Sequence, residues 1–269
     1  MRRKGSESGT ARGADRTNDS IPPANGSPQE ATLRLLGASL FHAPCAGDDA
    51  DPHVDSRMPE PALPRPSKII CVGRNYAAHA RELGNDVPER PLLFLKPPSS
   101  LIRDGGCIVL PRDSKRVEHE AEIGVVIGRK ARHVSAPEAL SCVAGYLPVN
   151  DVTARDLQKL DVQFTRAKGF DTFCPIGTPA PHDDWRELEV IGRVNGVVRQ
   201  HGRAADMIFG IPDIIAYVSR IMTLEPGDII ATGTPEGVGP LAPGDTIEIE
   251  IPGIGSISNP VEASDDEHD

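Results

Sequence analysis

Apolar residues fall mostly into short blocks along the chain, and such blocks predict strands more often than helices. Those at 68–72, 92–95 and 108–110 have the length of short buried strands. Residues 118–127 first alternate between polar and apolar side chains and then become continuously apolar, which predicts one long strand that enters the interior. Further strands are predicted at 146–149, 228–231, 246–251 and 254–257.

Helical spacing is confined to a few segments. In residues 211–222, apolar side chains recur three and four positions apart, which predicts an amphipathic helix with its apolar stripe in the core. The stripe comprises Ile211, Ile214, Ile215, Val218, Ile221 and Met222. Shorter helices are predicted at 77–83, 137–143 and 153–160. Gly84 is the expected stop of the first, and Asp151 or Thr153 the expected N-cap of the last.

The dipeptide Asn195-Gly196 predicts a β-hairpin. It separates two apolar segments, 188–194 and 197–200, and both of its residues tolerate the positive φ that a type I′ turn requires. Few of the predicted helices lie between consecutive strands. The expected fold class is therefore α+β and β-rich, with mixed or antiparallel sheets, rather than a doubly wound parallel sheet.

Composition divides the chain into four parts. Residues 1–29 are rich in small and polar residues without periodic apolar positions, and we expect them to be disordered. Residues 30–66 are interpreted as a small degenerate N-terminal element, with a strand or two within 31–41, followed by a proline-rich linker. Residues 67–262 form the main domain, and 263–269 an acidic tail that we expect to be disordered.

The charge balance argues against two classes of partner. The chain has 29 basic and 39 acidic residues and a net charge of −10, so we expect neither nucleic acid nor an anionic membrane surface as a partner. No run reaches the roughly 18 apolar residues of a membrane span, and the first residues, M-R-R-K, lead into polar sequence rather than a secretory signal. Five cysteines without a C-x-x-C pair favour a reducing, cytoplasmic location.

Carboxylates on the strand predicted at 118–127 are the first candidates for chemistry. Glu118, Glu120 and Glu122 should share one face, roughly 6.6 Å apart in sequence order, and His119 should face the other way as a structural residue. A hard divalent cation would relieve their repulsion, with Asp151 as a candidate ligand from a separate segment. The alternatives are solvated surface glutamates and an Asp151 that only caps a helix.

His79 and Glu82 are the second candidate group. They are three residues apart, so a helix at 77–83 would place them on one face. A histidine oriented by a carboxylate can activate water as a general base. An ordinary surface pair that stabilises the helix is the alternative.

Lys168 and a glycine-rich turn complete the candidates. Lys168 could stabilise an oxyanion, although a solvated lysine is the default interpretation. Backbone N–H groups in the turn T-G-T-P-E-G-V-G at 232–239 could bind an anion, or the turn could have no ligand. The turn lacks the Lys-Ser/Thr pair of a nucleotide-binding loop, and the chain has no G-x-S-x-G motif, so covalent catalysis is the weaker class.

Six motifs, in this order, resemble the fumarylacetoacetate hydrolase family from about residue 68 to about residue 261. They are C-V-G-R-N-Y-A-A-H-A-R-E-L-G, P-L-L-F-L-K-P-P-S-S-L, H-E-A-E-I-G-V-V-I-G, N-D-V-T-A-R-D-L-Q, T-R-A-K-G-F-D-T-F-C-P and T-G-T-P-E-G-V-G. The chain is most similar to the branch of acylpyruvases, oxaloacetate decarboxylases and 2-hydroxyhepta-2,4-diene-1,7-dioate isomerases. It departs from the family mainly before Lys68, where the N-terminal region is short and irregular.

The resemblance implies a β-rich fold of rolled sheets, a homodimer and a bound Mg²⁺ or Mn²⁺. It implies Glu120, Glu122 and Asp151 as metal ligands and leaves Glu118 outside the ligand set. It also implies Lys168 as a catalytic residue. The remaining implied residues are the pair His79 and Glu82, on a short helix that orders when substrate binds, and the substrate-binding residues Gln158, Arg74 and Thr234.

The expected function is divalent-metal-dependent hydrolysis of C–C bonds in 2-oxo acids similar to acylpyruvates, through an enolate that the cation stabilises. Nearly equal is an isomerase or decarboxylase of hydroxymuconate-like or 2-hydroxyhepta-2,4-diene-1,7-dioate-like diacids in aromatic catabolism, because R-A-K-G-F-D-T-F-C-P looks closer to that group. A binding protein without catalysis is disfavoured because competent residues occupy every implied catalytic position. The expected partner is thus a small 2-oxo acid or a dienedioate.

Overall fold

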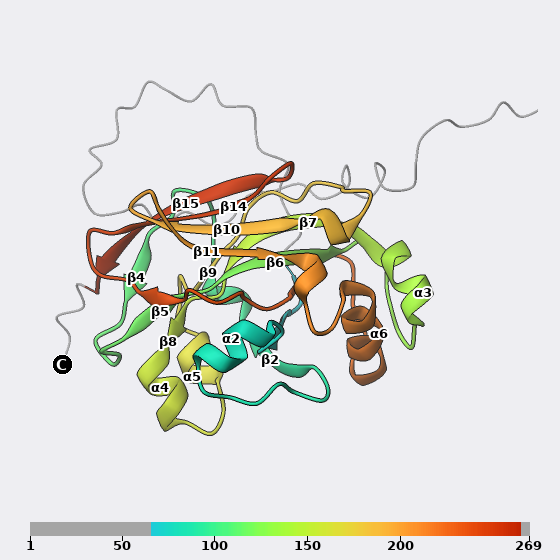
Figure 1. The fold of residues 1–269 in the computed structure, drawn as a ribbon, viewed down its shortest axis with the longest axis horizontal. Coiled ribbons are helices and arrows are strands. Elements are labelled where there is room, and N and C mark those ends of the chain that lie inside the picture. Colours follow the sequence, from blue (N-terminus) through green and yellow to red (C-terminus); the bar gives the residue numbers. More distant parts are fainter. Residues whose placement is uncertain (1–65, 265–269) are drawn as a thin grey trace, which may run out of the picture.

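A mixed five-stranded sheet runs through the centre of the computed structural model, which describes residues 66–264 (Figure 1). Its strands, in order across the sheet, are β2 (Leu92–Lys96), β1 (Ile69–Gly73), β12 (Ile229–Ala231), β6 (Ala121–Ile127) and β7 (Val143–Asn150). β1 and β12 are parallel and the other neighbours antiparallel. All seven residues of β6 are buried, as expected for a strand covered on both faces.

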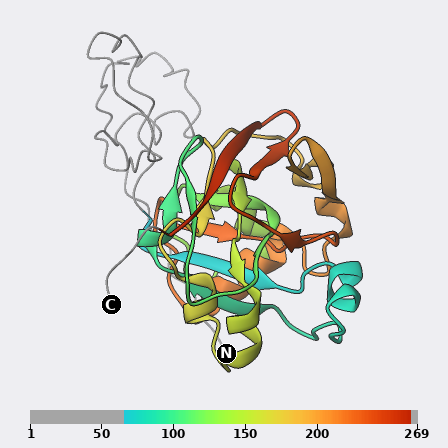
Figure 2. The same cartoon turned by 90° about the vertical axis from the view of Figure 1, so that its left-hand side faces the viewer.

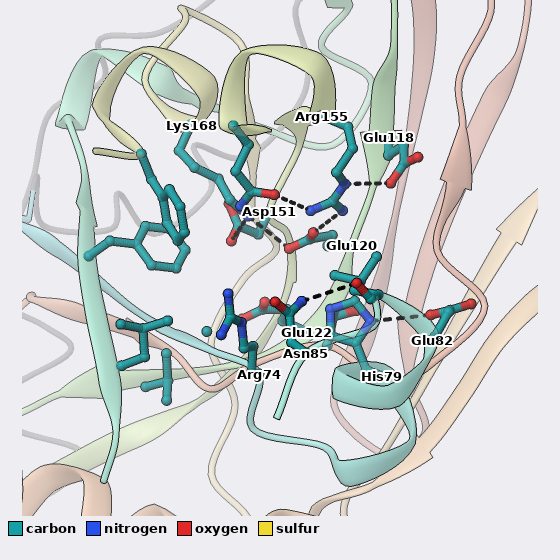
Figure 3. A pocket seen from close by; sticks show the side chains of 18 of the residues that line it. Arg74, His79, Glu82, Asn85, Glu118, Glu120, Glu122, Asp151, Arg155 and Lys168 are labelled. Atoms are coloured by element: carbon teal, nitrogen blue, oxygen red, sulfur yellow. Dashed lines mark hydrogen bonds and ion pairs between the residues drawn. The ribbon is translucent and has the colours of Figure 1, made fainter. Parts of the chain in front are cut away.

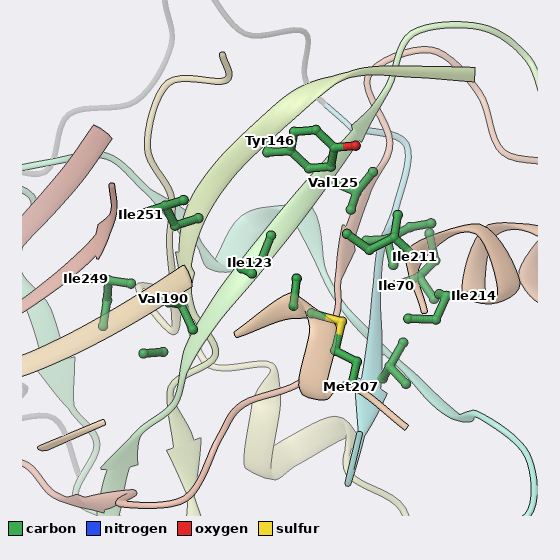
Figure 4. Close-up of a cluster of buried hydrophobic side chains, with 14 of the residues drawn as sticks. Ile70, Ile123, Val125, Tyr146, Val190, Met207, Ile211, Ile214, Ile249 and Ile251 are labelled. Carbon is green, nitrogen blue, oxygen red and sulfur yellow. The ribbon is translucent and has the colours of Figure 1, made fainter. Parts of the chain in front are cut away.

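A second five-stranded sheet lies over the first one (Figure 1). Its order is β11 (Val197–Arg203), β10 (Glu189–Val194), β14 (Thr246–Ile251), β15 (Gly255–Ala263) and β4 (Ile108–Leu110). The core fills the space between the two sheets, where Ile123 of β6 belongs to the same buried cluster as Val190 and Ile249 of the second sheet (Figure 4). Alternating inward-facing residues of β10 and β14 make this packing possible.

Two small sheets accompany the large ones. One has the order β13 (Gly239–Pro240), β5 (Val117–His119) and β8 (Thr153–Ala154), and the other pairs β3 (Leu101–Ile102) with β9 (Cys174–Pro175). The three-stranded sheet brings segments from three parts of the chain to the edge of the pocket described below.

The described helices are short. The α-helices are α2 (Ala77–Glu82), α3 (Ala136–Ala139), α4 (Arg155–Leu160), α5 (Thr165–Lys168) and α6 (Ile211–Ile221). Single 3₁₀ turns are η1 (Pro98–Ser100), η2 (Leu140–Cys142), η3 (Trp185–Glu187) and η4 (Ala204–Asp206). Figure 2 shows α4 and α5, coloured olive, beside each other on one side of the sheets. Within residues 66–264, no helix has the length and apolar character needed to cross a bilayer.

The predicted β-rich α+β class is confirmed, and most predicted elements lie where the sequence placed them. The hairpin of β10 and β11 turns at Asn195 and Gly196, with φ of 52° and 76°. The stripe of α6 is buried as predicted at Ile211, Ile214, Ile215 and Val218. The prediction that Ile221 belongs to the buried stripe is wrong. This residue lies in the last turn of α6 and is 56% exposed.

The prediction of a single strand at 118–127 is wrong. The strand is interrupted at Glu120, so that β5 belongs to the three-stranded sheet and β6 to the central one. The end of β7 holds the backbone of Glu120, because its N–H donates to Asn150 Oδ1 at 3.1 Å and its carbonyl accepts from the N–H of Asp151, the residue after the strand, at 2.9 Å. Glu118 and Glu122 therefore belong to different sheets rather than to one continuous face.

The start of the helix predicted at 153–160 is also wrong. Thr153 and Ala154 pair with β5, so the helix begins only at Arg155, and no side chain caps it. The Thr153 hydroxyl donates to the carbonyl of Asp151, and the carboxylate of Asp151 is bound by lysines. The expectations for residues 1–29, for a strand within 31–41, for the linker up to residue 65 and for the tail at 265–269 lie outside the described residues.

Asp228 fastens the start of the described chain to the turn that enters β12. Its Oδ1 accepts from the Ser67 N–H at 3.0 Å and from the Lys68 N–H at 3.2 Å. Its Oδ2 accepts from the Glu225 N–H at 2.8 Å and pairs with the Lys68 ammonium. Burial alone would raise the pKa of Asp228, but the hydrogen bonds from Lys68, Ser67 and Glu225 outweigh it and lower this pKa below its usual value.

We expect Asp228→Asn to lower the free energy of unfolding at pH 7 by about 2 kcal/mol, because it removes the charge to which these donors point. Since the folded-state pKa lies below the unfolded one, the carboxylate contributes fully above the unfolded pKa and loses its contribution as pH falls through the folded pKa. In urea unfolding, the gap between wild type and variant should shrink below about pH 4. Exposed Asp183→Asn is the control. A gap that stays constant to about pH 2 contradicts the argument.

Candidate active site

A pocket of about 510 Å³ opens beside the break between β5 and β6. All the predicted site residues line it, although they come from distant parts of the sequence: Arg74, His79, Glu82, Glu120, Glu122, Asp151, Gln158, Lys168 and Thr234. Figure 3 shows the labelled side chains converging on this space. The structure thus brings the whole predicted set together in one place.

Glu120, Glu122 and Asp151 form a buried acidic triad in this pocket. Glu120 sits in the break between β5 and β6, Glu122 follows it on β6, and Asp151 comes directly after the neighbouring strand β7. One carboxylate oxygen from each residue lies within 4.8 Å of the others, and all three residues are at most 5% exposed. They are therefore neither solvated surface charges nor, in the case of Asp151, a helix cap.

The triad can be tested for its fit to a divalent cation. Two oxygens that bind the same Mg²⁺ at about 2.1 Å are at most about 4.2 Å apart, and Mn²⁺ or Ca²⁺ allows slightly more. The observed limit of 4.8 Å exceeds this by an amount that small side-chain rotations can close. An all-carboxylate set of oxygen donors suits a hard cation. Glu120, Glu122 and Asp151 thus fit a divalent cation in number, type and spacing.

Two buried lysines neutralise part of the triad. The Lys168 ammonium donates to Glu120 Oε2 at 2.8 Å and to Asp151 Oδ2 at 2.7 Å, and it lies 4.9 Å from the centre of the Phe94 ring. The Lys96 ammonium donates to Asp151 Oδ1 at 2.7 Å and to the Val152 carbonyl at 3.0 Å. Both lysines are 1% exposed, so Lys168 is not a solvated side chain.

Arg155 separates Glu118 from the triad. Its Nε donates to Glu118 Oε2 at 2.7 Å, its Nη2 pairs with Glu120, and its Nη1 donates to Gln158 Oε1 at 2.6 Å. Arg116 binds the other oxygen of Glu118. With both oxygens occupied by arginines, Glu118 is an ion-pair partner rather than a third glutamate of the triad. Alternation along the strand could not decide this point.

The surroundings of Glu120 and Glu122 shift the pKa values of these two carboxyl groups in opposite directions, and they raise the pKa of Lys168. Burial would raise the pKa of Glu120, but Lys168 and Arg155 outweigh it and hold this pKa well below its usual range. Burial, with Asp151 and Glu120 nearby, raises the pKa of Glu122, which no cation among the described residues contacts. Burial would lower the pKa of Lys168, but Asp151 and Glu120 raise it, so Lys168 stays protonated.

His79 and Glu82 stand on the short helix α2 at the side of the pocket. His79 Nδ1 lies 3.3 Å from Glu82 Oε2, and His79 is only 3% exposed, which is unlike a surface pair. Glu82 Oε1 accepts from the Gly237 N–H at 3.0 Å, which ties α2 to the glycine-rich turn. A carboxylate at Nδ1 selects the tautomer with its proton on Nδ1 and leaves the lone pair of Nε2 available as a base.

The glycine-rich turn at 232–239 makes hydrogen bonds to other groups of the protein at the pocket wall. The Gly233 N–H donates to Glu122 Oε2 at 2.8 Å, so the anion that this amide binds is a triad carboxylate. Gly233 has φ of 103°, and a Cβ there would lie 2.7 Å from Asn75 Cβ, so only glycine fits. The Thr234 hydroxyl donates to the carbonyl of Ala121 at 2.9 Å. Thr234 is thereby fixed at the pocket wall.

Sequence reasoning missed Lys96, Arg155 and Gln200. The fully buried Gln200 makes four hydrogen bonds: its Oε1 accepts from His119 Nδ1 and the Ala121 N–H, both at 2.9 Å, and its Nε2 donates to Thr234 Oγ1 at 2.7 Å and Pro235 O at 2.8 Å. It thus joins the β5–β6 break to the glycine-rich turn. Nothing local distinguishes Arg155, Gln200 or Lys96, because Arg155 pairs with Glu118 and Glu120 and the other two also bind residues far away in the sequence.

The family of the chain follows from a comparison with known proteins. The sequence profile described as fumarylacetoacetate (FAA) hydrolase C-terminal matches residues 68–262. The chain belongs to the fumarylacetoacetate hydrolase family. This result confirms the resemblance predicted from the six motifs, and the family's enzymes are the context for the pocket.

Relatives of the chain within this family include enzymes that act on small organic acids. The mitochondrial oxaloacetate tautomerase of Arabidopsis thaliana is 47% identical over 203 residues, which cover 73% of this chain and 91% of the relative. The mitochondrial oxaloacetate decarboxylase of Dictyostelium discoideum is 46% identical over 195 residues, 70% of this chain and 89% of that one. The crystal structure of 5-carboxymethyl-2-hydroxymuconate delta-isomerase from Mycobacterium smegmatis has a TM-score of 0.70 at 47% identity and covers 74% of this chain and 80% of that one.

The role of Gln200 is open to a stability test. Gln200→Leu should lower the free energy of unfolding by roughly 3 kcal/mol, because it removes the hydrogen-bond partner of the Ala121 N–H, the Pro235 carbonyl and His119 Nδ1. Urea unfolding measures the change. Arg199→Leu, at an exposed position on the same strand, is the matched control and should change stability by less than about 0.5 kcal/mol. Equal effects of the two substitutions would contradict the assignment.

Proposed function

We propose that this enzyme carries out divalent-metal-dependent keto–enol chemistry, with tautomerisation, isomerisation or decarboxylation of a 2-oxo or 2-hydroxydiene dicarboxylic acid. One observation supports this proposal most directly: a buried acidic triad, a protonated lysine and a histidine–glutamate pair line the same pocket. Named relatives are an oxaloacetate tautomerase, an oxaloacetate decarboxylase and a hydroxymuconate isomerase, and their names agree with this reaction class. This choice reverses the order of preference suggested by the sequence.

Glu120, Glu122 and Asp151 would hold the cation. When bound, the divalent ion supplies a Lewis acid for the 2-oxo group of the substrate. The raised pKa of Glu122 supports the assignment, because this carboxyl group is buried beside two carboxylates and no cation among residues 66–264 contacts it, so it is missing a positive charge. Lys96 and Arg155 orient the triad: Lys96 fixes one oxygen of Asp151, and Arg155 fixes one oxygen of Glu120.

Lys168 would stabilise the negative charge that develops on the substrate. Its ammonium lies between Glu120 and Asp151, and its raised pKa keeps it a hydrogen-bond donor rather than a base. In decarboxylation of oxaloacetate, the bond between C3 and C4 breaks and C4 leaves as CO₂. The electron pair of this bond forms an enolate over C3, C2 and the 2-oxo oxygen. In tautomerisation, a proton leaves C3 and another is delivered to the 2-oxo oxygen.

His79 would move the proton at C3. With Nδ1 facing Glu82, its Nε2 takes the proton from C3 in enolisation and returns it after decarboxylation. The contact of Glu82 with the Gly237 N–H holds the pair in place against the glycine-rich turn. The pocket side chains thus provide an acid, a base and a cation site.

Hydrolysis of a C–C bond in an acylpyruvate is the second candidate. The same His79–Glu82 pair can activate water for attack on a distal carbonyl. The neighbouring rings of Phe94 and Phe164, edge-to-face with centres 5.6 Å apart, line the pocket and would accept an apolar acyl group. Spectrophotometric assays of oxaloacetate tautomerisation and decarboxylation against acetylpyruvate cleavage decide between the two. Turnover of acetylpyruvate alone overturns the first proposal.

The proposed metal site predicts a specific loss on substitution of Glu122. Glu122→Gln should reduce turnover of oxaloacetate at saturating Mg²⁺ or Mn²⁺ by at least about 100-fold and abolish the rise in Tm that the cation causes in the wild type. This substitution leaves the ion pairs of Glu120 and Asp151 intact, since within the described part of the chain Glu122 accepts only from the Gly233 N–H. Glu82→Gln is the control and should keep the Tm rise. An unchanged Tm rise in Glu122→Gln would remove Glu122 from the ligand set.

The proposed base predicts a loss in a different quantity. His79→Asn should lower kcat for oxaloacetate tautomerisation by about 1,000-fold, because a positioned acid–base group is lost, while the cation-dependent Tm rise stays as in the wild type. Stopped-flow assays with enolic oxaloacetate and thermal denaturation with Mg²⁺ measure the two effects. Loss of the Tm rise together with kcat would show that His79 supports the cation site instead.

A further inference from the structure

Arg74 is the one partly buried cation in the pocket wall whose side chain has no ion pair or hydrogen bond within residues 66–264. The two buried cations near it are ion-paired: Lys168 binds Glu120 and Asp151, and Arg155 binds Glu118 and Glu120. Arg116 binds Glu118, and Lys159 is exposed. A guanidinium that is drawn partly out of water without an anion lacks its natural partner.

The backbone holds Arg74 in an uncommon conformation. Its φ is 59°, in the left-handed region that disfavours side chains with a Cβ. The next residue, Asn75, is fully buried and fixed on both sides: its Nδ2 donates to the Thr232 carbonyl at 2.8 Å, and its Oδ1 accepts from the Phe209 N–H at 2.8 Å. A strained residue between β1 and α2 is thus kept in place by its neighbours, as is typical of a functional position.

Arg74 also lies apart from the other pocket cations. In Figure 3, Lys168 and Arg155 lie above Asp151 and Glu120, whereas Arg74 lies below them. A substrate whose 2-oxo end lies at the triad therefore has a second, separate cation available for its other end. A planar guanidinium with several donors binds a carboxylate in a bidentate manner, which a neutral acyl group cannot match.

We infer that Arg74 is the specificity-determining residue that binds the second carboxylate of a dicarboxylic substrate and so selects diacids over 2-oxo acids with an uncharged tail. This inference rests on the proposed function, which it narrows to diacids. It assigns different ends of one substrate to different walls of the pocket. The 2-oxo acid end lies at the triad and Lys168, and the distal carboxylate lies at Arg74.

Turnover of a diacid and a monoacid by the same variants tests the inference. Arg74→Gln should lower kcat/KM for oxaloacetate tautomerisation by about 100-fold, because the charge partner of the distal carboxylate is removed. It should change kcat/KM for acetylpyruvate cleavage by less than about 3-fold. Arg74→Lys should recover about 10-fold of the loss, since lysine keeps the charge but not the fork of donors. Lys159→Gln, the matched control at an exposed pocket cation, should stay within about 3-fold for both substrates. Equal losses for the two substrates in Arg74→Gln, or no loss for oxaloacetate, overturn the inference.

A binding measurement separates this inference from the proposed function. In the presence of Mg²⁺, isothermal titration should show that the wild type binds 2-oxoglutarate at least about 30-fold more tightly than 2-oxopentanoate, which has the same chain length and one carboxylate. Arg74→Gln should remove that preference. Absence of turnover on every substrate would defeat the proposed function while the preference still supports Arg74. Equal binding of the two acids by the wild type would defeat the role of Arg74.

Discussion

The structure depends on pairing buried carboxylates with buried cations around a break in one strand. Glu120 and Asp151 come from different strands, and Lys168, bound to both, holds them together from a helix. Charges this deep are tolerated only when they are paired and hydrogen-bonded, because each one alone carries a large desolvation cost. The same contacts therefore decide where β6, β7 and α5 meet. A change in any member leaves an uncompensated charge in the interior.

This arrangement leaves two groups incompletely matched, and they mark where ligands are expected. Among the described residues, Glu122 accepts a hydrogen bond only from a backbone N–H, and its raised pKa reflects a missing positive charge. Arg74 has the opposite character, since it is a cation without an anionic partner among residues 66–264, and a strained backbone holds it. Protein sites that bind charged ligands keep such unmatched groups, although complete pairing would stabilise the fold. A divalent cation and a dicarboxylate together have the charges that both positions lack.

Rigidity in the pocket comes from neutral groups as much as from ion pairs. Gln200 uses all its hydrogen-bonding capacity to join His119 and Ala121, on either side of the break at Glu120, to the turn that carries Thr234. The contact between Glu82 and Gly237 attaches the helix of His79 to the same turn. The proposed base, the proposed cation site and the turn thus share one supporting framework. Small displacements of catalytic groups cost large factors in rate, so such support matters for activity.

By itself, the sequence determined the fold class, most strand positions, the hairpin turn at Asn195-Gly196 and the set of residues that meet in the pocket, because these follow from local periodicity, turn chemistry and family motifs. Only the tertiary structure decided that the strand breaks at Glu120, that Glu118 pairs with arginines, and that Asp151 caps no helix. It alone revealed Lys96 and Gln200, whose partners lie 55 and 34 to 81 positions away. Contacts between distant segments are chosen by burial and charge pairing in three dimensions, and no local pattern records them.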